Sequence, residues 1–267
     1  MTAPTTPITT QQTFPLSGWP TELAQFIGYH APTLYLTLLA LVLLGTLLAF
    51  FGWRCLGPNR RRRMKRTYAV LGMIGFGFIA YQVMAFKDLP KFDALTAFYI
   101  SVHASFTYLD LAAKLSYLAQ GWVMAALAVL IGALLWWRHF RTEAVVYVLS
   151  IAGNGVLNTA IKIMAQRARP PHLHGVVIET GYSFPSGHSS GAMATYAMLA
   201  FILCQITAKR WHLLWVLLAS ALIVSIGFSR IYLQVHFISD VIAGFTSGSI
   251  WVLLCVAIYQ QQKRLGK

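Results

Sequence analysis

The sequence predicts an all-α fold, a bundle of helices that crosses a membrane several times. Its 267 residues are 57% hydrophobic and 10% charged, whereas an average soluble domain has roughly 25% charged residues. This composition excludes an ordinary soluble enzyme, a disordered chain and a small disulfide-stabilised secreted module. Two further observations support the same fold class: apolar runs long enough to span a bilayer, and basic residues that gather on one side of them.

Apolar runs account for most of the chain. A helix that spans a bilayer needs about 20 mostly apolar residues, and each run has close to that length. Two of the runs carry a charged residue, Lys162 and Asp240. The predicted spans are residues 31–53, 67–86, 118–137, 144–163, 190–207, 212–229 and 237–259.

The basic residues predict the direction in which these spans cross the membrane. Most of the 21 Lys and Arg residues lie in every second connection, or after the last span. Basic connections face the cytoplasm, so we expect the N-terminus outside the cell membrane and the C-terminus in the cytoplasm. Residues 1–30 contain no Lys or Arg and are expected to form a flexible outer tail, and residues 260–267 a cytoplasmic tail. The net charge of +14 therefore requires no nucleic-acid partner.

A few basic residues lie on the outer side and oppose this trend. Lys162, Arg169 and Arg230 are at predicted helix ends there, and Arg167 could assist them. Snorkelling to the interface would explain any one of them. An anionic ligand would explain all of them together, because Arg supplies fork-shaped donors and Lys a point charge for oxyanions.

Two nearby segments carry residue types that suit chemistry on such an anion. His236 and Asp240 are four residues apart, so they share a helix face, and an Asp beside one ring nitrogen leaves the other free as a nucleophile. Pro185 followed by Ser186 and Gly187 is a helix-start pattern, whose N–H groups and dipole favour a phosphate. His188, in the same turn, is a candidate proton donor.

The three segments together resemble the signature of the type 2 phosphatidic acid phosphatase and vanadium haloperoxidase superfamily. Lys162 precedes Arg169-Pro170 by six intervening residues, and Pro185-Ser186-Gly187-His188 follows. Ser229-Arg230 then precedes His236 by five intervening residues, and Asp240 comes after three more. The segments 162–170, 185–188 and 229–240 thus match at the expected spacing. The resemblance implies a membrane phosphatase domain over residues 67–259 with a six-helix core, and the helix at 31–53 is extra.

The resemblance also implies a role for each matching residue. His236 would attack phosphorus and form a phosphohistidine, Asp240 would orient it, and His188 would protonate the leaving oxygen and then activate water. The phosphoryl oxygens would be held without a metal ion or other cofactor by Lys162, Arg169, Ser186, Gly187 and Arg230. The substrate would be a lipid phosphate or diphosphate, such as polyprenyl (undecaprenyl) diphosphate, phosphatidylglycerophosphate, phosphatidate or lipid A.

Other functions remain open from the sequence. The same phosphohistidine could transfer phosphate to another lipid. An intramembrane serine protease could use Ser186 and His236, and a non-catalytic lipid transporter or channel could use the outer cations. A haloperoxidase is disfavoured by the membrane setting.

Two further segments near the site invite interpretation. Residues 92–109 have helical spacing and are expected to lie in the outer interface, with a polar face that includes Asp93, Thr96, Ser101 and Ser105. His172 and His174 could suggest a metal pair with Glu179, but we expect them to line the headgroup of the substrate instead.

Overall fold

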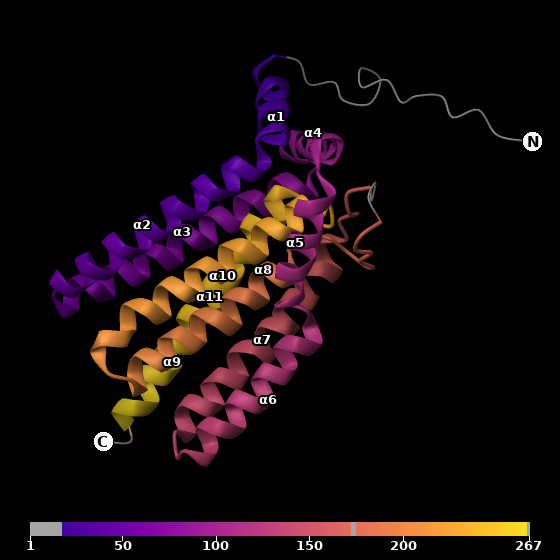
Figure 1. Ribbon diagram of the computed structural model, residues 1–267. Helices are drawn as coiled ribbons and strands as arrows, with labels where there is room; N and C mark the ends of the chain where they lie inside the picture. Colours follow the sequence, from indigo (N-terminus) through magenta and orange to yellow (C-terminus); the bar gives the residue numbers. More distant parts are fainter. Residues whose placement is uncertain (1–17, 172–174, 266–267) are drawn as a thin grey trace, which may run out of the picture.

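The computed structural model describes residues 18–171 and 175–265, and within these ranges the protein consists of helices without strands (Figure 1). In chain order the elements are α1 (Trp19–Tyr29), α2 (Ala31–Cys55), α3 (Pro58–Met84), α4 (Asp88–His103), α5 (Phe106–Tyr117), α6 (Gly121–Trp137), α7 (Arg141–Ala165), α8 (Gly187–Ala192), the π-helical turn η1 (Met193–Ala197), α9 (Met198–Ile206), the 3-10 turn η2 (Lys209–Trp211), α10 (His212–Tyr232) and α11 (Ile238–Leu265).

The structure confirms the all-α, multi-pass membrane fold. Seven segments of the described chain are long and apolar enough to cross a membrane. They correspond in order to the predicted apolar runs, as α2, α3, α5 with α6, α7, α8 through α9, α10 and α11. Helices α3 and α11 extend well beyond their runs, because the basic residues before residue 67 are helical within α3 and residues 260–265 continue α11.

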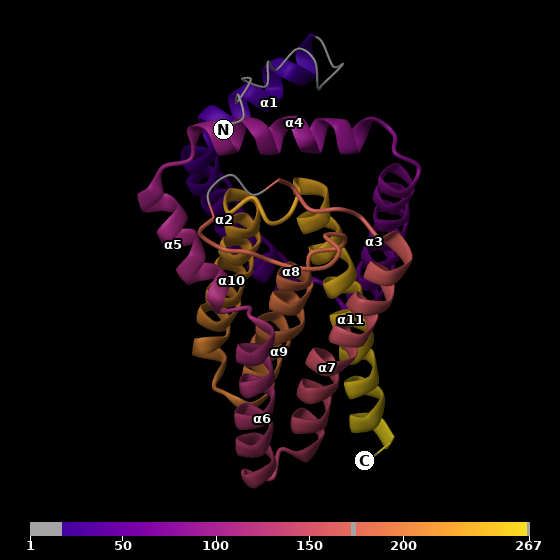
Figure 2. The same ribbon diagram turned by 90° about the vertical axis from the view of Figure 1, so that its right-hand side faces the viewer.

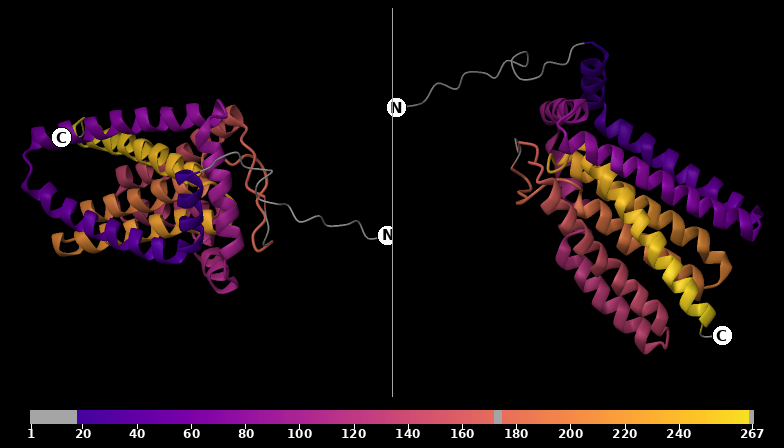
Figure 3. Two further views of the ribbon diagram at one scale, coloured as in Figure 1. Left: turned by 90° about the horizontal axis from the view of Figure 1, so that it is seen from above. Right: turned by 180° about the vertical axis from the view of Figure 1, so that it is seen from behind.

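The helices of the C-terminal half form the middle of the bundle. Helix α2 packs against α10 and α3 packs against α11, whereas α6 packs against α7 at the other edge (Figures 1 and 3). The continuous segment α8–η1–α9 lies between α7, α10 and α11.

Glycines let α11 approach α8 closely. A Cβ atom on Gly244 would lie 2.7 Å from the carbonyl oxygen of Ser186, and one on Gly248 would lie 2.8 Å from that of Ser190. Distances below about 3 Å are not tolerated by packed atoms, so these positions require glycine. The close approach also allows the Ser186 N–H to donate to the Asp240 carbonyl at 2.9 Å.

We expect Gly244→Ala to push α8 away from α11 and to destabilise the protein by about 1–3 kcal/mol, the usual cost of overpacking. Thermal unfolding in detergent measures this as a lower Tm. The matched control is Gly75→Ala in α3, where no atom lies within 4 Å of the added Cβ. A Tm for Gly244→Ala equal to that of Gly75→Ala would contradict the interpretation.

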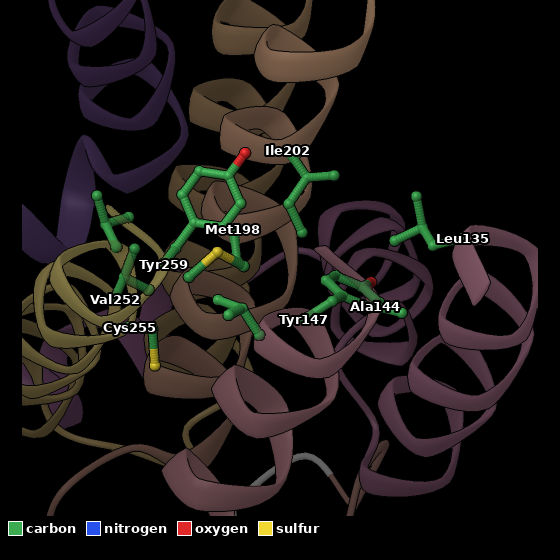
Figure 4. Close-up of a cluster of buried hydrophobic side chains, with 10 residues drawn as sticks. Leu135, Ala144, Tyr147, Met198, Ile202, Val252, Cys255 and Tyr259 are labelled. Atoms are coloured by element: carbon green, nitrogen blue, oxygen red, sulfur yellow. The ribbon is translucent and has the colours of Figure 1, made fainter. Parts of the chain in front are cut away.

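A hydrophobic cluster fixes the end of the bundle opposite α4. Figure 4 shows side chains of α6, α7, α9 and α11 converging on Tyr147 and Met198, which are fully buried. Beside this cluster the Tyr259 hydroxyl donates to the Glu143 carboxylate at 2.9 Å, and Lys263 Nζ lies 3.0 Å from the same carboxylate. The ends of α7 and α11 are thereby held together, which leaves their other ends in a fixed relation.

Helix α4 lies across the other end of the bundle, which we call the α4 end (Figure 2). The expectation for residues 92–109 is wrong in two respects. Two helices cover this stretch, because α4 ends at His103 and α5 begins at Phe106. The polar residues Asp93, Thr96 and Ser101 face the protein and are buried. Hydrogen bonds to buried partners and to the helix backbone satisfy them.

Helix α1 corrects the expectation that residues 1–30 form a flexible tail. Residues 1–17 lie outside the described part, but Trp19–Tyr29 is a helix that packs against α4. A Cβ on Gly28 would lie 2.5 Å from Cβ of Tyr99, and Gln25 Nε2 donates to the Tyr99 hydroxyl at 2.8 Å. This contact holds the segment in place.

The additional span α2 is attached to α10 along its length. The Tyr35 and Ser225 hydroxyls lie 2.7 Å apart, and the Thr46 hydroxyl donates to Ser220 at 3.3 Å. Near the α4 end, α2, α5 and α10 line an apolar cavity of about 110 Å³ that includes Leu115 and Ser229. The cavity is therefore one residue away from Arg230 along α10.

Candidate active site

The three segments singled out in the sequence meet at the α4 end of the bundle. Arg169, in the loop after α7, contacts the loop between α10 and α11, where its Nη1 donates to the Val235 carbonyl at 2.7 Å and to His236 Nε2 at 3.2 Å. Ser186, at the start of α8, is joined to Asp240 by the backbone hydrogen bond described above. Residues far apart in the chain thus form one site.

His236 and Asp240 adjoin, but His236 lies in the loop before α11 and not on the shared helix face that their spacing predicts. His236 Nδ1 lies 3.5 Å from Asp240 Oδ2, which is longer than the usual hydrogen bond of 2.7–3.2 Å. The same carboxylate oxygen accepts the Phe237 N–H at 3.0 Å. Both side chains are buried. The ring is therefore oriented with Nδ1 toward Asp240 and Nε2 toward Arg169.

Burial and nearby cations determine the charge of His236. Burial holds the pKa of its imidazole well below the ordinary value, and the positive charges of Arg230, Arg169 and Lys162 lower this pKa further. The ring is consequently neutral at neutral pH, so Nε2 can carry a lone pair. A neutral imidazole surrounded by cations is a nucleophile placed beside a binding site for an anion.

The start of α8 has the expected helix-initiating geometry. Ser186 is the N-cap residue, and its hydroxyl accepts from the Ser189 N–H at 3.3 Å and from the Ser189 hydroxyl at 3.0 Å. Gly187 and His188 form the first turn. His188 Nε2 is buried and makes no hydrogen bond with the described residues, so it is available to a ligand.

Arg230 and Glu179 form an ion pair that sequence reasoning missed. Arg230 is fully buried, its Nη2 donates to Glu179 Oε1 at 2.6 Å, and its Nη1 donates to the Ser116 hydroxyl. The same Glu179 oxygen lies 3.9 Å from His188 Nε2. The Glu179 carboxylate therefore lies between the buried Arg230 and His188. An anionic ligand would compete with this carboxylate for the same position. The signal available in the sequence was that Glu179 is one of only 7 acidic residues.

Lys162 and Arg169 hold the loop that carries Glu179. The Lys162 ammonium donates to the Tyr182 carbonyl. Arg169 Nε and Nη2 donate to the Gly181 and Thr180 carbonyls at 3.1 and 3.2 Å. Both cations thus bind the backbone of this loop, and Arg169 also contacts His236; that they hold phosphate oxygens stays a prediction.

Arg167 does not join the cations around His236, contrary to the expectation that it could assist them. Its Nη1 lies 2.6 Å from Asp240 Oδ1 and its Nη2 lies 2.8 Å from Asp93 Oδ2. Burial raises the pKa of the Asp93 carboxyl, and the charge of Arg167 and a hydrogen bond from Ser239 oppose this rise. Arg167 is thus shared between two buried carboxylates behind His236.

The suggested metal pair cannot be placed as such. His172 and His174 lie outside the described residues, and Glu179 pairs with Arg230. Within the described ranges, no three His, Cys, Asp or Glu side chains are grouped as ligands of a metal ion.

The fold and the site together define a class of protein. It is an integral membrane protein with two histidines, a carboxylate and several cations gathered at one end of its helix bundle, a combination suited to phosphoryl chemistry. Residues 143–264 match the family model of the PAP2 superfamily.

Curated relatives of the chain are phosphatases. It is 29% identical over 153 residues to phosphatidylglycerophosphatase B of Bacillus subtilis, and the aligned region covers 56% of this chain and 74% of that protein. It is 30% identical over 119 residues to lipid A 1-phosphatase of Rhizobium etli, and the aligned region covers 41% of this chain and 47% of that protein.

The fold is shared with a solved structure. The crystal structure of a transmembrane PAP2 type phosphatidylglycerolphosphate phosphatase from Bacillus subtilis superposes with a TM-score of 0.67 at 24% identity. The superposition covers 72% of this chain and 96% of the solved one. This chain therefore has the fold of a PAP2-type membrane phosphatase together with segments beyond it.

Proposed function

We propose that this protein is a lipid phosphatase that hydrolyses phosphate monoester or diphosphate groups through a phosphohistidine intermediate. The observation that carries the proposal is the environment of His236. Its Nδ1 faces Asp240 and its Nε2 faces Arg169 at 3.2 Å, in a buried ring whose pKa is lowered by burial and by three cations. Such a ring is positioned to attack an anion that the cations bind.

In the first step, Nε2 of His236 attacks phosphorus while the bond from phosphorus to the leaving oxygen breaks. Arg169, Arg230 and Lys162 hold the phosphoryl oxygens, with Ser186 and the Gly187 N–H at the start of α8. Because these donors are already oriented, they stabilise the charge that develops in the transition state, and removal of one such donor typically costs about 10²–10³ in kcat. Asp240 stabilises the imidazolium that forms.

His188 handles the protons in both steps. Its Nε2 gives a proton to the leaving oxygen in the first step. In the second step it accepts a proton from a water molecule, whose oxygen attacks the phosphohistidine and releases inorganic phosphate. The buried position of Nε2, without a hydrogen-bond partner in the described part of the chain, supports this role.

A lipid is the substrate class that fits the surroundings. The site lies within a membrane protein, and the apolar cavity between α2, α5 and α10 adjoins the helix that carries Arg230. The names of the curated relatives refer to phosphatidylglycerophosphate and lipid A as substrates of those proteins. We propose these lipids, phosphatidate and polyprenyl diphosphate as candidates.

The charge distribution supports an orientation for this activity. The start of α3 and the end of α11 are rich in basic residues, which favours the cytoplasm. The α4 end would then face outward, so that the reaction takes place at the outer face of the cell membrane. The phosphatase domain would comprise residues 67–259, with α1 and α2 added before it.

Two alternatives share parts of the site. Transfer of phosphate to another lipid would use the same phosphohistidine and differ only in the acceptor. A serine protease built on Ser186 is disfavoured, because the Ser186 hydroxyl is fully buried and, among the described residues, its hydrogen bonds go to Ser189 and not to a histidine.

Phosphate release by the purified protein from a panel of the four lipid classes, with and without EDTA, tests the proposal. We expect at least one lipid to be hydrolysed at a rate that EDTA does not change, because protein cations take the place of a metal ion. An activity that disappears with EDTA would overturn the metal-independent mechanism. Phosphate that appears on a second lipid instead of in solution would favour transfer.

A further inference from the structure

We propose that Asp93 is a positioning residue for His236 and acts on it through Arg167 and Asp240. This inference rests on the proposed function, since it assumes that His236 is the nucleophile. Asp93 belongs to α4, which lies outside the segment 143–264 that matches the superfamily. The residue is buried, with 1% of its surface exposed, and it points from α4 into the bundle.

Asp93 binds both the guanidinium of Arg167 and the start of α11. Its Oδ2 accepts from Arg167 Nη2 at 2.8 Å and from the Ser239 hydroxyl, and its Oδ1 accepts from the Ser239 N–H at 3.2 Å. Ser239 directly precedes Asp240 near the N-terminus of α11, where N–H groups have no partner within the helix. A side chain of α4 therefore fixes the turn of α11 that carries Asp240.

Arg167 connects the two carboxylates in a defined geometry. Its Nη1 donates to Asp240 Oδ1 at 2.6 Å and to the Ser239 hydroxyl at 2.8 Å, and its guanidinium carbon lies 4.2 Å from the centre of the Phe237 ring. With Oδ1 of Asp240 held by Arg167, the other oxygen of the carboxylate, Oδ2, is turned toward His236 Nδ1. The hydrogen bond from Arg167 to Oδ1 thus fixes the rotamer of Asp240.

The charges give Asp93 a second effect on the same residue. Asp240 alone with Arg167 would form a neutral pair, which could do little to stabilise the imidazolium formed when His236 bonds to phosphorus. With Asp93 present and both carboxylates ionised, the group of three carries one net negative charge. Because the group is buried, this charge acts on His236 with little screening. The presence of Asp93 therefore leaves Asp240 able to support the nucleophile.

Asp93→Asn tests the proposal, because it removes the charge and keeps the size of the side chain. We expect kcat to fall by about 10–100-fold, the range for a small misplacement of a reacting group, with KM changed less than about twofold, since the phosphate-binding cations are untouched. The matched control is Asp88→Asn on the same helix, where the carboxylate is exposed and pairs with Lys91. This variant is expected to keep the kcat of the unmodified protein.

Two readouts separate positioning from a general loss of structure. The first is the fraction of protein that can be labelled as phosphohistidine, which should stay unchanged in Asp93→Asn while the rate of labelling falls. A smaller labelled fraction with an unchanged rate would instead indicate partial unfolding and would overturn the proposal. The second is the effect of Asp93→Asn in an Asp240→Asn background, which should be small because both changes act through the same carboxylate.

The outcomes for the two proposals are distinct. Activity that is lost in His236→Ala but unchanged in Asp93→Asn would overturn only the role of Asp93. If the fold-losses in kcat of Asp93→Asn and Asp240→Asn multiply in the double variant, this role of Asp93 would also be overturned. Activity that persists in His236→Ala would overturn the proposed function itself.

Discussion

Replacement of His236 by alanine is expected to abolish phosphate release, with a fall in kcat on the order of 10⁴-fold or more, the scale seen when a nucleophile is removed from an enzyme that forms a covalent intermediate. The physical reason is that no other group in the described site combines a neutral nitrogen lone pair with contact to the binding cations. The initial rate of phosphate release from a lipid substrate measures the loss.

The phosphohistidine gives this prediction a second measurement. Protein incubated with radiolabelled substrate and quenched in base should carry an acid-labile label, and His236→Ala should carry none. The matched control is His212→Ala, a histidine at the start of α10 near the opposite end of the bundle, where its ring contacts the Thr207 carbonyl. A label that persists in His236→Ala would show that another residue accepts the phosphoryl group.

Replacement of His188 by alanine is expected to lower kcat by about 10²–10⁴-fold, which is the usual contribution of a general acid and base. Its Nε2 is buried and free of hydrogen bonds to described residues, and it lies 3.9 Å from the Glu179 carboxylate that occupies the site. The loss should be largest for lipid phosphates, whose alkoxide leaving groups need a proton.

The leaving group distinguishes this role from a purely structural one. With p-nitrophenyl phosphate, which needs no proton on its leaving group, His188→Ala should still form the phosphohistidine. It should then accumulate the label, because no base activates water for the second step. A variant that loses labelling with both types of substrate would contradict the assignment of His188 as the proton carrier and would point instead to a defect in binding.

The spans and the core of the site could be read from the sequence because both depend on local patterns. About 20 consecutive apolar residues identify a spanning helix wherever it packs, and all of the predicted spans are present. In the same way, Ser186 caps the helix that follows it, and His236 lies 3.5 Å from Asp240, only four residues further along the chain. Contacts between residues three or four positions apart are restricted by the short stretch of chain that joins them.

The errors concern residues whose environment is set by distant segments. Asp93 lies in a stretch with an apolar stripe, and periodicity alone assigned it to a solvated face. In the folded protein it is buried against Arg167 and Ser239, which lie 74 and 146 residues further along the chain. Arg167 was expected to assist the neighbouring Arg169 and the other outer cations, but it turns to the two carboxylates instead.

The order of residues along the chain was therefore sufficient for the membrane class, the spans and the set of groups that we propose to bind and transfer a phosphate. The tertiary structure alone decided which of these groups face one another: Glu179 against Arg230, Arg167 between Asp93 and Asp240, and α1 on α4. The physical reason is that hydrophobic length and helical spacing act within a segment. A buried charge, in contrast, takes whichever partner the packing of remote helices brings within reach, because it is too costly to leave without one.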